Sequence, residues 1–473
     1  MSTQQIITEL KDKNDALEHE NAILRKALFG PRSEKVKPSS ADESQLNLFA
    51  DLEVEQAQVE TTTIEVKGHK KKKHKGRQPL PDHLPVEEII IEPDYDTSDM
   101  VKIGELVTET LHYTPANLVR LRYIRPKYAA KDGQEIIVAD LPERPLPKSI
   151  AEASLLSHII VSKFVDHLPF YRIIKQFQRD YDLTIPSSTL NDWFAASCTL
   201  LEPLYNRLKQ KVLDTDYLQA DESPIKVMDK DKVGKTHQGY QWVYHNPLEK
   251  LILFDYRKGR GMHGPKELLA DYIGVLQCDG YGVYDKLAKN GEMTLAGCLT
   301  HVRRKYVEAK DSDAKLANHA LDIFSKIYLH EKQAKHSENR KAYRQIHILP
   351  LMQNLKQWTE QQYLKVLPKS PIGKAMKYTL NQWHKLMNIF NDTEIELDNN
   401  LIENKIRPLA LGRKNYLFAG SHKGAQRIAM MYSFFATCKA NDVNPFEWLK
   451  KTLEQIPTCS IQDLDMLLPN SYS

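Results

Sequence analysis

The feature that most constrains this fold is a change in hydrophobic period near residue 216. Residues 151–210 carry apolar side chains at helical spacing, and from 216 the apolar residues fall into short strand-like runs. The runs read YLQADESPIKV, YQWVYHN, KLILFDYRKG and GVLQCDGYG, spaced as a meander, and LAGCLTHVRRKYVEA reads as a fifth strand running into a helix. Residues 311–390 are strongly helical again. The pattern predicts a multidomain α/β protein with a helical segment after a sheet.

Length and composition set further limits. A chain of 473 residues is too long for one ordinary core, so two to four domains are expected. No run of about 18 apolar residues occurs, and the start, MSTQQIITELKDKND, lacks the apolar core of a signal peptide. We therefore expect a cytoplasmic protein with no membrane partner. Five cysteines lie far apart without a CxxC pair, which favours buried free thiols over a zinc site.

Residues 6–28 predict a coiled coil and hence a homodimer or higher oligomer. Leucines repeat at one heptad position, and the other core position includes two asparagines, which select register and favour a parallel dimer at some cost in stability. The residues expected to dimerise are Leu10, Asn14, Leu17, Asn21 and Leu24. The alternative is an amphipathic helix that packs on its own domain.

Two clusters of cations indicate a phosphate backbone as partner. Residues 66–77 contain Lys70, Lys71, Lys72, Lys73 and Arg77 and no acid. Residues 404–427 also lack acids and contain six Lys or Arg. Such clusters suit DNA, because binding releases condensed counterions. The alternative is a solvated linker and a solvated helix face.

The middle of the chain predicts a β-containing module and then a helical one. Residues 81–150 hold β-rich runs such as VEEIIIE and NLVRLRYIRPKY. Helices are expected over 154–165, near 169–180, and over 190–198 with a cap at Ser187-Ser188-Thr189. The outline resembles a helix-turn-helix DNA reader, and a plain helical bundle is the alternative.

Cutting or joining a phosphodiester requires a deprotonated oxygen nucleophile and neutralisation of charge on the attacking and leaving oxygens. Two hard cations about 4 Å apart supply both. Mg²⁺ prefers oxygen ligands and keeps several waters, so a few carboxylates hold it. Such a site needs Asp or Glu converging from separate elements beside cations that hold DNA.

Three acids meet this requirement. Asp221 is expected where the apolar run YLQA ends in a charged turn, and Asp279 ends the similar run VLQC. The first and fourth strands of the meander can lie side by side, which would bring both carboxylates to one edge. Glu403 lies in a helical pattern that starts at Asp398-Asn399-Asn400 and shares a face with Arg407. The alternative for each acid is a solvated surface charge.

Several motifs make the chain resemble transposases of the insertion sequence 66 family, a group of bacterial DDE transposases. They are LFGPRSEK at 28–35, GRQPLPDHLP at 76–85, VSKFVDHLPFYR at 161–172, ADESPIKV at 220–227, CDGYGVYDKLAKNGEMTLAGCLTHVRRKY at 278–306 and DNNLIENKIRPLALGRKNYLFAGSHKGAQ at 398–426. The resemblance covers nearly the whole chain, and the last two motifs are long and specific.

The resemblance implies an RNase H-like mixed-sheet core with a helical insertion before the glutamate. It places the catalytic, metal-holding triad on Asp221, Asp279 and Glu403, with Mg²⁺ or Mn²⁺ as cofactor. It also implies DNA partners, terminal inverted repeats and target, and two small accessory proteins of the same element. Members usually carry four cysteines after the linker, but the matching stretches EPDYDTSDMVKIGE and KYAAKDGQE have none, so no zinc is expected.

Neighbouring residues have open roles. His301, Arg303 and Arg304 could face the scissile phosphate, or the two arginines could be solvated helix charges. Arg407, Arg413 and Lys414 could clamp DNA. Glu222 is expected to be solvated rather than to support Asp221. Trp242, Tyr284 and Tyr416 are expected in the core, and base stacking is the alternative.

The sequence therefore predicts a DNA transposase that cleaves element ends and joins the 3′-OH to target DNA. The alternatives are a catalytically silent DNA-binding protein that retains the scaffold and a structure-directed nuclease or resolvase. The expected layout is a coiled coil at 1–30, a flexible basic linker at 31–80, a β-containing module at 81–150, a helical DNA-binding module at 151–212, the first part of the core at 213–310, a helical insertion at 311–395, the glutamate helix at 396–430 and a C-terminal helical segment at 431–473.

Overall fold

The computed structural model describes residues 84–472 except 99, 115–116, 131–135, 229–234 and 290, together with Leu80 and Asp82. The expected coiled coil and its five dimerisation residues lie outside the described residues. The basic run with Lys70, Lys71, Lys72, Lys73 and Arg77 also lies outside them.

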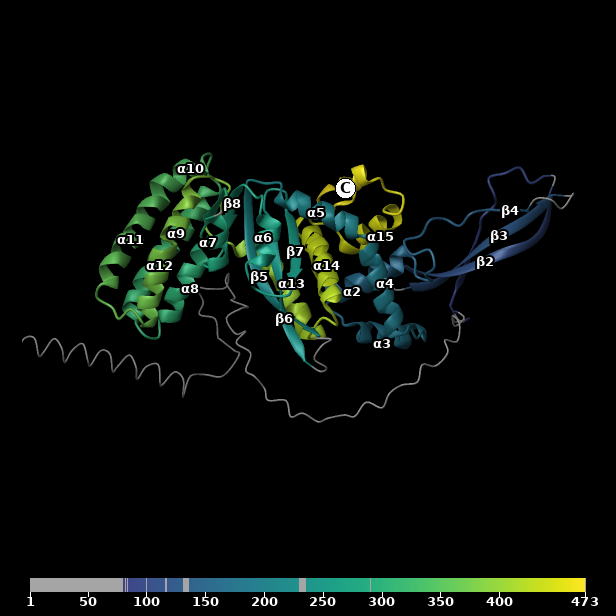
Figure 1. Ribbon diagram of the computed structural model, residues 1–473, viewed down its shortest axis with the longest axis horizontal. Helices are drawn as coiled ribbons and strands as arrows, with labels where there is room; N and C mark the ends of the chain where they lie inside the picture. The colour runs from purple at the N-terminus through teal and green to yellow at the C-terminus, as the bar shows by residue number, and fades with distance from the viewer. Residues whose placement is uncertain are drawn as a thin grey trace, which may run out of the picture.

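A five-stranded mixed sheet forms the centre of the molecule (Figure 1). Its strands are the five predicted runs: β5 Tyr217–Met228, β6 Thr236–Asn246, β7 Leu251–Arg257, β8 Gly274–Gln277 and β9 Met293–Ala296. The order is β7-β6-β5-β8-β9, with β5, β6 and β7 antiparallel and β8 and β9 parallel to β5. The first and fourth strands are therefore neighbours, as expected.

Helices cover this sheet and share its core. Those that share its core are α5 Glu202–Leu213, α6 His263–Leu269, α7 Gly282–Ala288, α13 Asn400–Tyr416, α14 His422–Ala440 and α15 Pro445–Gln455, whereas α8 Leu299–Ala309 follows β9 and packs into a second core. α14 lies against β7, where Ser433 and Thr437 hydroxyls accept the N–H groups of Phe254 and Ile252. The short helices η3 Ile461–Leu467 and η4 Pro469–Ser471 follow α15. The boundary expected at 430/431 falls inside α14, which runs through it unbroken.

The segment between β9 and α13 is helical, as its composition predicted. It comprises α9 Ala314–Ala334, α10 Arg340–Tyr343, the π-helical turn η1 Arg344–Ile348, α11 Leu349–Tyr363, α12 Pro371–Met387 and the 3₁₀ turn η2 Asn388–Phe390. These helices and α8 enclose a second hydrophobic core that includes Phe324, Met352 and Met376. Figure 1 shows them grouped at one end of the molecule, beyond β8.

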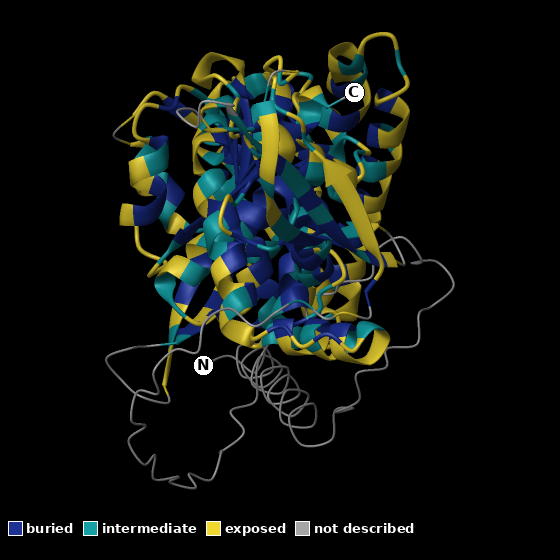
Figure 2. Cartoon of the chain, turned by 90° about the vertical axis from the view of Figure 1, so that its right-hand side faces the viewer, coloured by how far each residue is buried: buried dark blue, intermediate teal, exposed yellow. Residues whose placement is uncertain are grey.

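A β-sheet arm stands at the opposite end (Figure 1). It contains β1 Val86–Ile90, β2 Met100–Thr114, β3 Asn117–Ala130 and β4 Ile136–Val138. β3 is central, antiparallel to β2 and β4 and parallel to β1. Figure 2 shows largely exposed strands at this end in front of a buried interior, which agrees with the mostly exposed pattern of β2.

The helical module between arm and sheet contains α2 Ala153–Phe164, α3 Phe170–Tyr181 and α4 Ser187–Leu200. The predicted cap at Ser187-Ser188-Thr189 is wrong: α4 begins at Ser187 after Pro186, and no side chain caps it. Proline at that position fixes an extended entry into the helix, which replaces a capping hydroxyl. α4 packs through Trp193 and Phe194. The residues Ser187, Asn191 and Asp192 are exposed on this helix, and none of them is a Lys or Arg.

All five cysteines are unbonded, and Cys198, Cys278, Cys298 and Cys438 are buried, as predicted for structural thiols. Among the described residues, no helix combines the length and the apolar character needed to cross a membrane.

Candidate active site

Two parallel strands bring Asp221 and Asp279 to one edge of the sheet. β5 and β8 pair over 217–219 and 275–277, and the last pair is Gln219 with Gln277. Each aspartate lies two residues beyond that pair, so both carboxylates start from equivalent positions. The predicted charged turn at Asp221 is wrong, because β5 continues to Met228 and Asp221 pairs with Val243 of β6. What ends beyond Gln219 is the neighbour β8, which leaves one side of β5 open.

A repeated sequence pattern, which the sequence-based prediction of the site did not use, marks this arrangement. Both strands read Leu-Gln-x-Asp, at 218–221 and 276–279. The two glutamines are fully buried, and Gln219 Nε2 donates to Gln277 Oε1 over 2.9 Å. Gln219 also donates to the carbonyl of Asp398, and Gln277 to that of Glu396. The pattern thus supplies one carboxylate and one anchor per strand.

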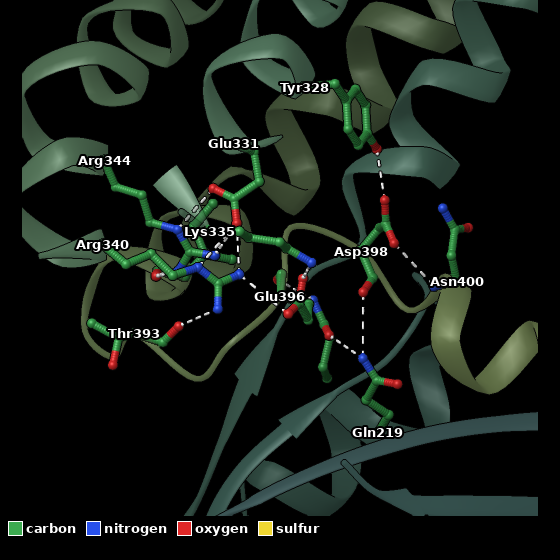
Figure 3. Close-up of polar contacts among 12 residues, drawn as sticks. Gln219, Tyr328, Glu331, Lys335, Arg340, Arg344, Thr393, Glu396, Asp398 and Asn400 are labelled. Carbon is green, nitrogen blue, oxygen red and sulfur yellow. Dashed lines mark hydrogen bonds and ion pairs between the residues drawn. The ribbon is translucent and has the colours of Figure 1, made fainter. Parts of the chain in front are cut away.

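The third carboxylate, Glu403, lies in the first turn of α13, which begins at Asn400 as predicted. The approach to this helix is held in place by Asp398 (Figure 3). One Asp398 oxygen accepts the N–H of Asn400, and the other accepts the hydroxyls of Thr300 and Tyr328. Asp398 is therefore a structural acid whose fixed partners orient the start of α13.

The far end of α13 is tied to the same strand. Arg413 donates to Ser223 Oγ over 3.0 Å and to the carbonyl of Pro224. Beyond the helix, Ala419 exchanges backbone hydrogen bonds of 2.8 Å with Lys226 and Met228 of β5. Glu403 therefore sits on a helix that is fixed to β5 at its C-terminal end and to the segment after β9 at its N-terminal end.

A cavity of about 240 Å³ lies between these elements. Its walls come from β5, α8 and α13 and consist of Asp221, Glu222, Ser223, Pro224, His301, Arg304, Glu403, Ile406 and Arg413. The structure thus brings Asp221 and Glu403 to one cavity. Asp279 is not part of the wall but is close enough to act on the charge of Asp221.

The electrostatics of the cavity are dominated by crowded acids. Burial raises the pKa of Asp221 well above its usual range, and the nearby carboxylates of Glu222, Asp279 and Glu403 raise it further. Burial and Asp279 also raise the pKa of Glu222 to about 6, against the opposing effect of Arg260. Oε1 of Glu403 and Oε2 of Glu222 are buried atoms without a hydrogen-bond partner in the described chain.

Glu222 is not solvated, which corrects the sequence-based expectation. Only 3% of its side chain is exposed, and Arg260 donates to its carboxylate over 2.5 Å. The Arg260 guanidinium stacks 4.2 Å from the ring of Tyr281, whose N–H donates to Asp279. Glu222, Arg260 and Tyr281 therefore link the two aspartate-bearing segments. No local sequence signal pointed to Arg260, which lies in the glycine-rich turn after β7.

The predicted cations divide into two groups. Arg304 contacts Glu403 at 3.4 Å, and His301 Nε2 lies 3.7 Å from the other oxygen of that carboxylate. Burial lowers the pKa of His301, although Glu403 opposes the shift. Arg413 lines the cavity, and burial lowers its pKa. The remaining predicted cations are not in the cavity wall: Arg303 and Arg407 are half-buried, and Lys414 is exposed. Of the expected core aromatics, Trp242 and Tyr284 are fully buried, and Tyr416 is half-buried.

The donor chemistry suits a hard divalent cation. All three predicted ligands offer carboxylate oxygens, and the unpartnered Glu403 Oε1 borders the cavity. Within the described residues, however, no three His, Cys, Asp or Glu side chains stand close enough together to hold a metal ion. Asp221 and Glu403 line one cavity with Asp279 nearby, but in the described part of the chain the three carboxylates do not meet at a common point.

A larger cavity of about 470 Å³ lies elsewhere, between α5, β7 and α14. Its wall contains none of the three predicted carboxylates. Two of its acids, Asp255 and Glu267, are paired with Arg257. Its polar groups therefore largely satisfy one another, and the smaller cavity is the better candidate for chemistry.

Comparisons with known proteins agree with these features. A family profile described as "Transposase IS66 family" matches residues 148–427, one described as "Transposase C of IS166 homeodomain" matches 16–89, and one described as "IS66 C-terminal element" matches 433–470. The uncharacterized protein y4jD of Sinorhizobium fredii is 31% identical, over 96% of this chain and 94% of its own. Two further uncharacterized proteins of that organism, y4qI and y4hP, are 28% and 29% identical over 95% and 96% of this chain.

Proposed function

Because the chain belongs to the IS66 family of transposases, whose activity is DNA transposition, we propose that it cleaves the ends of an insertion sequence and joins the freed 3′-OH to target DNA. Asp221, Asp279 and Glu403 are the proposed catalytic carboxylates. The observation that carries this assignment is their arrangement: Asp221 and Asp279 come from equivalent positions on paired parallel strands, and Glu403 of α13 lines one cavity with Asp221. The effect of Asp279 and Glu403 on the pKa of Asp221 supports it.

We further propose that the central sheet and its helices form an RNase H-like core. Three antiparallel strands followed by two parallel ones, in the order β7-β6-β5-β8-β9, support this proposal. The helices α9 to α12 then correspond to the insertion before the glutamate. The expected boundaries of the domains remain part of the proposal, except the one at 430/431, which falls inside α14.

Mg²⁺ or Mn²⁺ is the proposed cofactor, held by Asp221, Asp279 and Glu403, and zinc is not required. Bound ions would activate the attacking oxygen and neutralise charge on the leaving oxygen. Side chains of the cavity wall support this role. Arg304 fixes one oxygen of Glu403, and the other has no hydrogen-bond partner. Arg413, held against β5, presents a guanidinium at the cavity wall where a phosphate would enter.

The proposed partners are DNA, both terminal inverted repeats and target, a second copy of the chain, and two small accessory proteins. DNA binding is supported by the absence of acids from residue 404 to residue 441. Dimerisation is proposed through residues 6–28. The basic residues Lys70 to Lys73 and Arg77, with Arg303, Arg407 and Lys414, are proposed to contact DNA.

The test is cleavage and joining of the inverted repeats that flank the gene, with Mg²⁺ or Mn²⁺ added. D221N, D279N and E403Q should each abolish both steps while leaving the protein folded and able to bind DNA. D255N is the matched control, because Asp255 is a buried acid of the same sheet outside the cavity. Activity that survives replacing all three carboxylates with alanine would refute the mechanism.

One observation favours a second candidate, a DNA-binding protein without catalysis. In the described part of the structure, the acids do not lie close enough to one another to hold a metal ion. That candidate predicts binding to element ends with no strand transfer under any divalent metal. The transposase proposal instead predicts that metal and DNA draw the carboxylates together, because the cation removes their mutual repulsion.

A further inference from the structure

The chain leaves α13 through a strained turn. Leu417 has φ 63° and ψ −45°, and the N–H of Phe418 donates to the carbonyl of Tyr416 over 2.7 Å. These values describe a γ-turn with positive φ, a rare conformation that a side chain disfavours. Glycine would adopt it freely, yet the chain has leucine there.

Both ends of this turn are fixed, so it cannot relax. On one side the N–H of Leu417 donates to the carbonyl of Arg413, in the last turn of α13. On the other, Ala419 is buried and pairs with β5 through two hydrogen bonds of 2.8 Å. Ser421 then caps α14 by accepting the N–H of Gly424. Strain of this kind persists only where the surroundings impose it.

The strained backbone does not bury the side chains of this turn. Leu417 is 64% exposed and Phe418 is 41% exposed. A purely structural turn would place apolar groups inward or use small polar residues. Two adjacent apolar side chains are instead held at the surface on a fixed backbone.

The surroundings indicate what these side chains meet. Lys414 and Lys423 are exposed on either side of the turn, and no acid occurs between Glu403 and Asp442. Cations that hold phosphates beside apolar side chains are the combination by which proteins part stacked bases. A surface that binds a second protein would more often carry acids among its cations. The absence of acids from this part of the sequence therefore makes DNA the better match.

We propose that Leu417 and Phe418 form an apolar wedge that enters the base stack of the bound DNA. This inference rests on the proposed function, which places DNA at the carboxylate cavity. Ala419 lies beside Val227, six residues beyond Asp221 on β5. At about 3.3 Å per residue Val227 lies about 20 Å from Asp221, and the wedge directly precedes its neighbour Ala419. That span corresponds to about six base steps at about 3.4 Å each. The wedge therefore acts about six base pairs from the scissile phosphate.

The test uses the full chain and a duplex oligonucleotide with the inverted repeat that flanks the gene. A single 2-aminopurine is placed in turn at each position near the cleaved end, because its fluorescence rises when it unstacks. The wild type should give a severalfold rise at one or two neighbouring positions. The L417A/F418A double variant should lose that rise while still binding the duplex, and L417M should keep it.

Two controls separate the wedge from folding and from chemistry. L417G relieves the backbone strain and removes the side chain, so it should melt no lower than the wild type and still lose the rise. D221N should keep the rise and lose cleavage, so a failure of the proposed chemistry is distinguishable from a failure of the wedge.

Three results would overturn the inference. One is no rise at any position with the wild type, and another is a full rise with L417A/F418A. The third is a change in the oligomeric state of L417A/F418A without DNA, measured by light scattering, which would assign the pair to a protein interface.

Discussion

The buried ion pair between Glu331 and Arg344 anchors the helical segment that precedes α13, and R344M tests its contribution. Only 6% of the Glu331 side chain and 1% of the Arg344 side chain are exposed. Arg344 donates twice to Glu331, over 3.0 and 2.6 Å, and also to the carbonyls of Ile389 and Asp392. Figure 3 shows this pair beside Arg340, which links Glu331 to Glu396 and Thr393.

The size of the effect follows from these contacts. Removing one partner of a buried ion pair usually costs about 3 to 5 kcal/mol, because the other charge is left uncompensated. Here Arg340 still donates to Glu331, over 2.6 and 3.2 Å, so part of the compensation remains. We therefore expect R344M to lower the free energy of unfolding of this segment by about 3 kcal/mol.

Hydrogen exchange of the α9 and α12 amides measures this loss directly, with thermal unfolding as a second readout. K356M is the matched control, because Lys356 forms an exposed ion pair with Glu360 on α11 and should cost less than about 1 kcal/mol. E331M/R344M should recover most of the loss, since no buried charge is left alone and Arg340 keeps Glu396. A cost of R344M no larger than that of K356M would refute the reasoning.

Three further predictions concern packing, pH and metal. G412A should destabilise the protein by about 1 to 3 kcal/mol, because its Cβ would lie 2.1 Å from the Tyr432 hydroxyl; G282A, with open space around it, should be neutral by thermal melting. Burial lowers the pKa of His245 to about 3, so its imidazole is neutral in the fold and protonates on unfolding. Stability should therefore fall as the pH drops from about 6.5 towards 3, by up to about 4 to 5 kcal/mol, and H245Q should remove that dependence in urea titrations across this range. Mg²⁺ should raise the melting temperature of the wild type, an increase that chelation reverses and that D221N lacks.

Local patterns predicted the strands and helices because the period of apolar residues reports which face is buried. They failed at Asp221, where the run Asp-Glu-Ser-Pro at 221–224 indicated a turn. Pro224 is tolerated inside β5 because β8 has already ended, so one side of the strand is an edge. The strand therefore continues with turn-like composition, a consequence of where its neighbour stops rather than of its own residues.

Contacts between distant segments could not be predicted in this way. Glu222 meets Arg260 across 38 residues, and Arg413 meets Ser223 across 190. Nothing in the spacing of these residues distinguishes them from solvated charges, because the contact depends on how β7 and α13 fold back onto β5. The position of a residue is predictable when its partners are close in sequence or on a paired strand. It is not predictable when the partner lies on an element that is distant in sequence and packs against it only in the folded protein.

The burial of the acids is itself an argument about function. A solvated acid has little effect on stability, whereas a carboxylate without a hydrogen-bond partner in the interior costs several kcal/mol. Glu222 and Glu403 each have such an oxygen beside the half-buried Asp221, whose pKa is raised by desolvation and by its acidic neighbours. Apolar side chains of similar volume at these positions would be more stable. A cluster that lowers stability in the free protein is best explained by a ligand that offsets the cost when bound, and a hard cation between carboxylate oxygens does so.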